Sequence, residues 1–132
     1  MQYVSTRDSS LRYSASQAIV QGLSRDGGLF LPETIPVLSL QDLKELRSLP
    51  YVQRAARIMK LFLDEFTLEE LTEYAQKAYR FGEKFDTPQV VPIVAVEPKT
   101  YLLELWHGPT SAFKDLALQM LPYLLTAALK KT

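Results

Sequence analysis

The chain has 132 residues, of which 47% are hydrophobic and 23% charged, as is usual for one globular domain. Fifteen Lys and Arg balance fifteen Asp and Glu, so no net charge favours nucleic acid or an anionic membrane. The absence of cysteine and the single histidine exclude disulfides, a cysteine nucleophile, and thiolate or multi-histidine metal sites. The N-terminus has neither a signal peptide pattern nor a membrane anchor. We therefore expect a cytoplasmic protein with no metal, nucleic-acid or membrane partner.

The first thirty residues predict a strand pair with a helix between the two strands. Tyr3–Thr6 is rich in β-forming residues, and Leu29–Leu31 follows a double glycine, so these two segments are expected to pair. Ser14 and Gln17 have the spacing of a capping box, which predicts a helix that begins near Ser14 and ends near Gly22.

Apolar residues recur at helical spacing from Ser39 to Gly82, and this pattern predicts three helices separated by Pro50 and by a second capping box at Thr67 and Glu70. The last two helices are expected to pack antiparallel. These apolar stripes are typical of a small helical bundle, so no catalytic role is expected of them. The predicted buried residues are Leu40, Leu43 and Leu46, then Val52, Ala55, Ala56, Met59, Leu63 and Phe66, then Leu68, Leu71, Ala75 and Ala78.

A second unit is predicted after residue 87, where proline becomes frequent and helical periodicity stops. We expect one domain at residues 1–87 and the start of another at residues 88–132. In the second unit, Val90–Val96 and Tyr101–Leu105 are expected to be extended, with a turn between them. The fold class expected for the whole chain is α+β, mainly helical.

A final helix is expected from about Lys114 to Lys130, with a bend at Pro122 and apolar residues on nearly every side. An element that is apolar all round must be covered all round. We therefore expect that the chain is cut from a longer protein or exposes a large interface.

The segment 104–115 is the candidate for chemistry, since it gathers the only tryptophan, the only histidine, a Gly-Pro turn, two hydroxyls and a lysine between a strand and a helix. Ligand sites in α/β folds lie at the carboxyl ends of strands. A lysine held beside helix N-terminal amides in a partly apolar pocket is pushed toward the neutral amine, which can form a Schiff base with an aldehyde. Judged from the residues alone, a solvated surface lysine is the alternative for Lys114.

Two motifs resemble the threonine synthase family. Residues 107–115, His-Gly-Pro-Thr-Ser-Ala-Phe-Lys-Asp, follow Leu-Glu-Leu at 103–105 and resemble the pyridoxal phosphate lysine motif of that family. Near the N-terminus, Tyr3–Arg7, a serine-initiated helix, Asp26–Phe30 and Pro32 resemble the family's N-terminal signature in order and spacing. The resemblance covers the whole chain, although residues 38–85 match only in helical character.

The resemblance implies a fold type II enzyme that uses pyridoxal phosphate and converts O-phospho-L-homoserine and water to L-threonine and phosphate. Residues 1–87 would be its N-terminal helical domain, and residues 88–132 the first strands and helix of a truncated α/β catalytic domain. By match to the motif, Lys114 would be the catalytic residue that carries the cofactor as a Schiff base and then moves protons. Phe113 would lie against the pyridine ring, with a plain core aromatic as the alternative.

Other residues have weaker candidate roles. Thr110 and Ser111 are candidates to donate to a substrate phosphate or carboxylate, although Ser111 is also expected to be the N-cap of the final helix. Arg7 is a candidate partner of the substrate phosphate, with a surface strand as the alternative. The helix dipole accounts for Asp115, and a structural role is expected for His107.

The sequence lacks the Gly-rich phosphate loop and the partner of the pyridine nitrogen that such an enzyme needs. The isolated chain is therefore expected to be inactive, to bind the cofactor weakly or not at all, and either to self-associate through Leu116–Leu129 or to fold this helix over the N-terminal bundle. Two other functions stay open: a phospho-lyase that acts on the same ester without forming threonine, and a non-catalytic helical interaction module.

Overall fold

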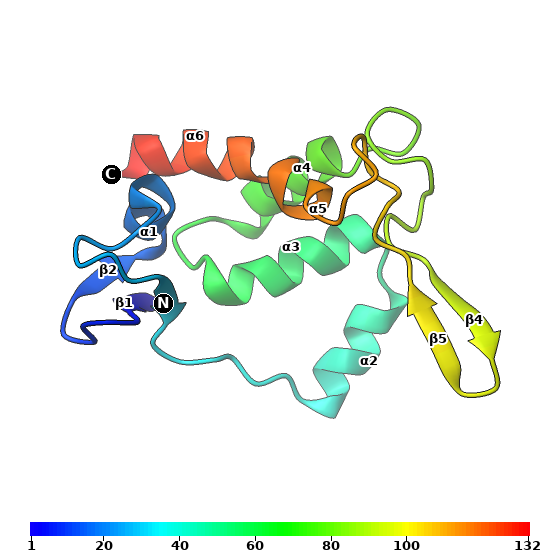
Figure 1. Ribbon diagram of the computed structural model, residues 1–132, viewed down its shortest axis with the longest axis horizontal. Helices are drawn as coiled ribbons and strands as arrows, with labels where there is room; N and C mark the ends of the chain where they lie inside the picture. The colour runs from blue at the N-terminus through cyan, green and yellow to red at the C-terminus, as the bar shows by residue number, and fades with distance from the viewer.

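The computed structural model describes residues 1–132 and begins with a three-stranded antiparallel sheet (Figure 1). Its strands are β1 (Gln2–Ser5), β2 (Arg12–Ser14) and β3 (Phe30–Pro32), in the order β2-β1-β3. The predicted pairing of the first and last strands is confirmed, with Val4 opposite Leu31. The sequence analysis missed β2, since three residues are too few to show an alternating pattern.

The helix α1 (Ala15–Gln21) has the predicted caps at both ends. The Ser14 side chain accepts a hydrogen bond from the Gln17 backbone N–H, and the Gln17 side chain accepts one from the Ser14 backbone N–H. Gly22, at φ 75°, ends the helix in a conformation that favours glycine.

Three further helices follow: α2 (Leu40–Ser48), α3 (Tyr51–Phe62) and α4 (Leu68–Ala78). Both α2 and α4 begin with a complete capping box, at Ser39 and at Thr67. The predicted stripe of α4 is largely buried, but α2 buries only Leu46 of its three leucines, and Leu40 is 78% exposed. Helix α2 packs mainly against α3 (Figure 1), and Leu40 and Leu43 in its first half stay largely exposed.

A hairpin of β4 (Ile93–Glu97) and β5 (Thr100–Leu103) projects from the helices (Figure 1). Both extended segments were predicted at this place, but β4 begins three residues later than the pattern suggested. Val90 has a φ of 63°, which interrupts the extended backbone before Ile93. All residues of the two strands are exposed.

The prediction of one bent final helix is wrong, because the segment forms two helices, α5 (Asp115–Leu118) and α6 (Leu121–Lys131). Pro122 lies in the first turn of α6. The missing N–H of a proline costs no helical hydrogen bond at that position. Pro122 therefore marks the start of a helix and does not bend the middle of one.

One apolar core joins both halves of the chain. Phe66, Leu71 and Ala128 are fully buried in it, and Ala128 belongs to α6, which packs against α1 (Figure 1). Packing of the apolar final segment over the N-terminal elements, one of its two predicted outcomes, is observed for α6, and self-association stays a prediction. The mainly helical α+β fold class is confirmed, and the division at residue 87 stays a prediction.

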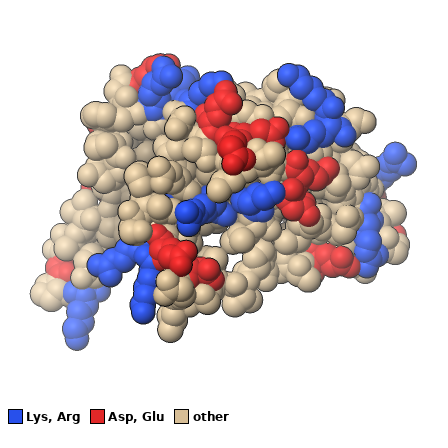
Figure 2. Space-filling model, turned by 180° about the vertical axis from the view of Figure 1, so that it is seen from behind, with Lys and Arg blue, Asp and Glu red and all other residues tan.

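Charged side chains of both signs are interspersed on the face shown in Figure 2. None of the six helices combines the length and the apolar character needed to cross a membrane.

We predict that Leu71→Ala lowers the free energy of unfolding by about 2–5 kcal/mol, because the substitution leaves a cavity in the core. Urea unfolding followed by circular dichroism measures the change. Leu40→Ala is the matched control, since Leu40 is exposed, and its expected effect is within about 0.5 kcal/mol. Equal losses in the two variants would contradict the assigned core.

Candidate functional site

The loop between β5 and α5 ends at Lys114, which is the N-cap position of α5 and has helical backbone angles. The Lys114 side chain is exposed and has no carboxylate partner. Phe113 beside it is 64% exposed. The partly apolar pocket expected around the amine is therefore not formed by residues 1–132, and both side chains are free to meet another surface or a ligand.

Asp115 closes this loop on itself. Its side chain is buried, and its carboxylate accepts hydrogen bonds from the backbone N–H of Thr110 at 2.8 Å and from the Thr110 hydroxyl at 3.0 Å. Gly108 packs so closely that a Cβ there would lie 2.5 Å from the Asp115 Cβ. The helix-dipole interpretation of Asp115 is therefore incomplete, and both polar donors of Thr110 are directed at Asp115.

The prediction that Ser111 caps the final helix is wrong. Ser111 has a φ of 55°, whereas an N-cap residue has extended backbone angles, and Lys114 occupies the N-cap position without a side-chain hydrogen bond. The Ser111 backbone N–H donates to the Gly108 carbonyl at 3.1 Å, which tightens the loop into a turn. Its exposed hydroxyl has no partner in the chain.

His107 connects two segments of the chain, its own loop and the segment after α4. Its Nδ1 lies 2.6 Å from Asp86 Oδ1, and its Nε2 lies 2.7 Å from Glu104 Oε2. The Asp86 backbone N–H donates to the His107 carbonyl at 3.1 Å. The hydrogen bond with Glu104, followed by that with Asp86 and the charges of both carboxylates, raises the pKa of His107 above its ordinary value. The structural role predicted for His107 agrees with this arrangement.

Arg7 follows β1, which lies at the opposite side of the view in Figure 1 from β5, the strand after which the Lys114 loop begins. Its guanidinium donates to the Asp26 carbonyl at 3.1 Å. The Asp26 carboxylate accepts from the buried Ser5 hydroxyl at 2.7 Å, so these residues form a local network that holds the turn before β3. The structure therefore does not bring Arg7 to the other candidate residues.

Sequence reasoning missed Asp86 and Glu104 as partners of the histidine. Glu104 is three residues from His107, a spacing at which a carboxylate could have been considered. Asp86 is 21 residues away and in another segment, so no local signal identifies it.

Residues 104–115 fit part of a pyridoxal phosphate site. Lys114 offers an unpaired primary amine for the aldehyde, and Phe113 offers an exposed aromatic face for the ring. Gly108 is the one glycine in this segment, and the other four lie elsewhere, so no glycine-rich phosphate cradle forms between β5 and α5. Residues 1–132 thus supply the amine and the aromatic ring but not a cradle for the phosphate.

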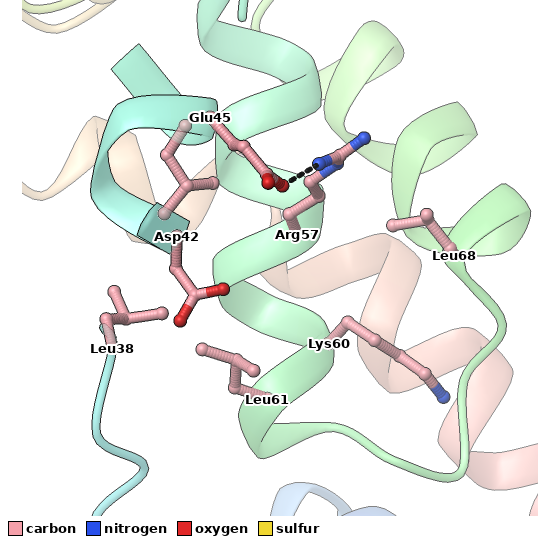
Figure 3. Close-up of a pocket in the computed structure, with 8 residues that line it drawn as sticks. Leu38, Asp42, Glu45, Arg57, Lys60, Leu61 and Leu68 are labelled. Carbon is pink, nitrogen blue, oxygen red and sulfur yellow. Dashed lines mark ion pairs between the residues drawn. The ribbon is translucent and has the colours of Figure 1, made fainter. Parts of the chain in front are cut away.

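The pocket in Figure 3 lies between α2, α3 and α4 and has a volume of about 240 Å³. Its charged groups already have partners: Arg57 lies 3.9 Å from Glu45, and Lys60 donates to the carbonyls of residues 64 and 66. The pocket contains none of the predicted site residues. Its lining residues are Leu38, Asp42, Glu45, Leu46, Arg57, Lys60, Leu61 and Leu68.

The family described as "Threonine synthase N terminus" matches residues 2–79. A threonine synthase of Corynebacterium glutamicum is 37% identical over 136 residues, which cover 99% of this chain and 28% of that protein. The human protein named threonine synthase-like 1 is 37% identical over 112 residues, covering 83% of this chain and 15% of its own length.

Among solved structures, the pyridoxal-phosphate-bound threonine synthase of Brucella melitensis has a TM-score of 0.90 and 35% identity. The match covers 99% of this chain and 28% of that one. The chain thus spans little more than a quarter of the length of these threonine synthases, and the similarity includes the segment that carries α5 and α6.

We predict that the stabilisation contributed by His107 declines as pH rises. Since the pKa of His107 is higher in the folded state, its contribution is fully present below the unfolded pKa and is lost as pH rises through the folded value. Urea unfolding of the unmodified protein and His107→Gln measures this contribution. The difference between the two proteins should be larger at about pH 6 than at about pH 8.5. An equal difference at both pH values would show that protonation of His107 does not contribute.

Proposed function

The chain belongs to the threonine synthase family, and from this premise we propose that the protein carrying it converts O-phospho-L-homoserine and water to L-threonine and phosphate. The single observation that carries the proposal is the lysine motif at 107–115 within a chain that matches threonine synthases along nearly its full length. The chain spans 28% of those relatives, so the complete activity is attributed to the whole protein. The isolated 132-residue chain is proposed to be inactive.

Lys114 is proposed as the residue that attaches the cofactor and then moves protons. Pyridoxal phosphate, when bound, supplies the electron sink for reactions at the substrate carbons next to the amino group. The unpaired, exposed Nζ of Lys114 is available for attachment through the cofactor's aldehyde. Once released by the substrate amine, Nζ is an amine held at the same place, able to carry a proton between Cα, Cβ and Cγ.

Supporting roles are proposed for three neighbouring residues. The exposed ring of Phe113 would orient the cofactor by lying against its pyridine ring. The Ser111 hydroxyl, which has no partner in the chain, is the better candidate to donate to a substrate anion. Thr110 would have to give up its bonds to Asp115 for the same role, so its contribution is proposed to be indirect.

The remaining proposals concern the chain as a whole. We assign residues 1–87 to an N-terminal domain and residues 88–132 to the beginning of the catalytic domain, and we place the protein in the cytoplasm. The leucines of α5 and α6 that stay exposed support self-association of the isolated chain through Leu116–Leu129. For Arg7 to bind the substrate phosphate as proposed, another part of the whole protein has to place the substrate beside β1.

A phospho-lyase that acts on the same ester is the second candidate, because the lysine motif at 107–115 fits both reactions. The two reactions differ in whether water is added at Cβ. Analysis of the products formed from O-phospho-L-homoserine separates them, since only the first yields threonine together with phosphate.

We predict that Lys114→Ala in the full-length protein removes both turnover and the visible absorbance of the attached cofactor, because the motif offers no second amine. Borohydride reduction followed by peptide mass spectrometry should locate the cofactor on Lys114 in the unmodified protein. Lys44→Ala is the matched control, since Lys44 is an exposed lysine on α2. Reduction that traps the cofactor on another lysine would overturn the assignment.

A further inference from the structure

Two polar clusters hold the loop that ends in Lys114, one at each end. At its beginning, His107 is bonded to Asp86 and to Glu104. At its end, buried Asp115 accepts two hydrogen bonds from Thr110. The proposed function uses Lys114 and Phe113 but leaves the first cluster without a role.

The geometry of the first cluster requires a protonated histidine for full bonding. A neutral imidazole has one N–H and can donate to only one carboxylate, whereas an imidazolium donates to both. Distances of 2.6 Å and 2.7 Å on its two sides are those of charge-assisted hydrogen bonds. The Trp106 ring lies beside the imidazole, with 5.7 Å between ring centroids and an interplanar angle of 28°.

The position of His107 affects that of Lys114 through two contacts of Gly108, one with Asp115 and one with Ser111. Gly108 follows His107 directly and packs against Asp115 with no space for a side chain. Asp115 follows Lys114 directly, so a shift of Gly108 displaces the residue next to the reactive lysine. The hydrogen bond from Ser111 to the Gly108 carbonyl makes the turn between them compact.

We propose that Asp86, Glu104 and His107 form a positioning clamp that sets the placement of Lys114 for the reaction. The proposal rests on the proposed function of Lys114. None of the three residues is assigned a contact with substrate or cofactor; they act through Gly108 and Asp115. The clamp also connects the segment after α4, which supplies Asp86, to the loop after β5.

The clamp is expected to weaken when His107 loses its proton. His107 and Asp86 line a pocket of about 220 Å³ together with two other charged residues, Glu83 and Lys84. The Glu83 carboxylate is paired with Arg80 at 2.7 Å. The Asp115 carboxylate packs against Gly108 and accepts its hydrogen bonds from Thr110, not from His107. Asp86 and Glu104 are therefore the carboxylates that hold the imidazolium, and one of them loses its donor at high pH.

The test compares His107→Gln with the unmodified full-length protein loaded with pyridoxal phosphate. The expected result is a kcat lower by on the order of 100-fold with KM unchanged, since misplacement by about 1 Å has effects of this size. Borohydride trapping at Lys114 should stay complete. The fall in kcat of the unmodified protein at alkaline pH should be absent in the variant. Glu73→Gln, which removes a surface ion pair of α4 with Lys77, is the matched control.

A second readout uses the cofactor-free protein. Hydrogen exchange of the amides at 107–116 should be faster in His107→Gln than in the unmodified protein at the same pH, because the loop is no longer held at its beginning. Glu73→Gln should leave exchange in this segment unchanged.

The outcomes separate the clamp from the function on which it rests. Absence of trapping at Lys114 in the unmodified protein would overturn the proposed function and the clamp's role in it. Complete trapping, together with wild-type kcat and wild-type exchange in His107→Gln, would overturn the clamp alone. Loss of kcat with an unchanged pH profile and unchanged exchange would overturn it as well.

Discussion

The burial of one apolar face shared by α3, α4 and α6 is the constraint on which the rest of the structure depends. Phe66 and Leu71 have no exposed surface, and alanines line the contacts between the helices. Ala15 of α1 and Ala128 of α6 are almost fully buried, so the first and last helices approach closely with no large side chain between them. A single core thereby includes residues from both ends of the chain.

The same core places the loop of the candidate site. The hydroxyl of Tyr79, at the end of α4, donates to the Leu116 carbonyl in α5 at 2.9 Å, and its ring packs edge-on against Tyr51 and Phe85. Burial, together with the neighbouring Tyr51, raises the pKa of Tyr79, so this hydroxyl stays a donor. Lys114 precedes a helix that is attached to the core, while its own side chain stays exposed.

Features that depend on neighbouring residues were predictable from the sequence. The capping boxes at Ser14 and Thr67 depend on side chains three residues apart, and each forms as predicted. Features that depend on distant partners were not. The exposure of Leu40, the strand β2 and the pairing of His107 with Asp86 all require knowledge of which segments meet in space.

The sequence by itself determined the capped helix starts at Ser14, Ser39 and Thr67, the pairing of β1 with β3, the class of fold and the lysine motif, because each is encoded in spacing along the chain. Only the tertiary structure decided that the final segment breaks into two helices, that Arg7 is bonded to Asp26, and that Thr110 binds Asp115. The physical reason is that burial and hydrogen-bond partners are properties of the packed chain. Thr110 donates to the buried Asp115 carboxylate and not to a ligand because packing places that carboxylate within about 3 Å of it.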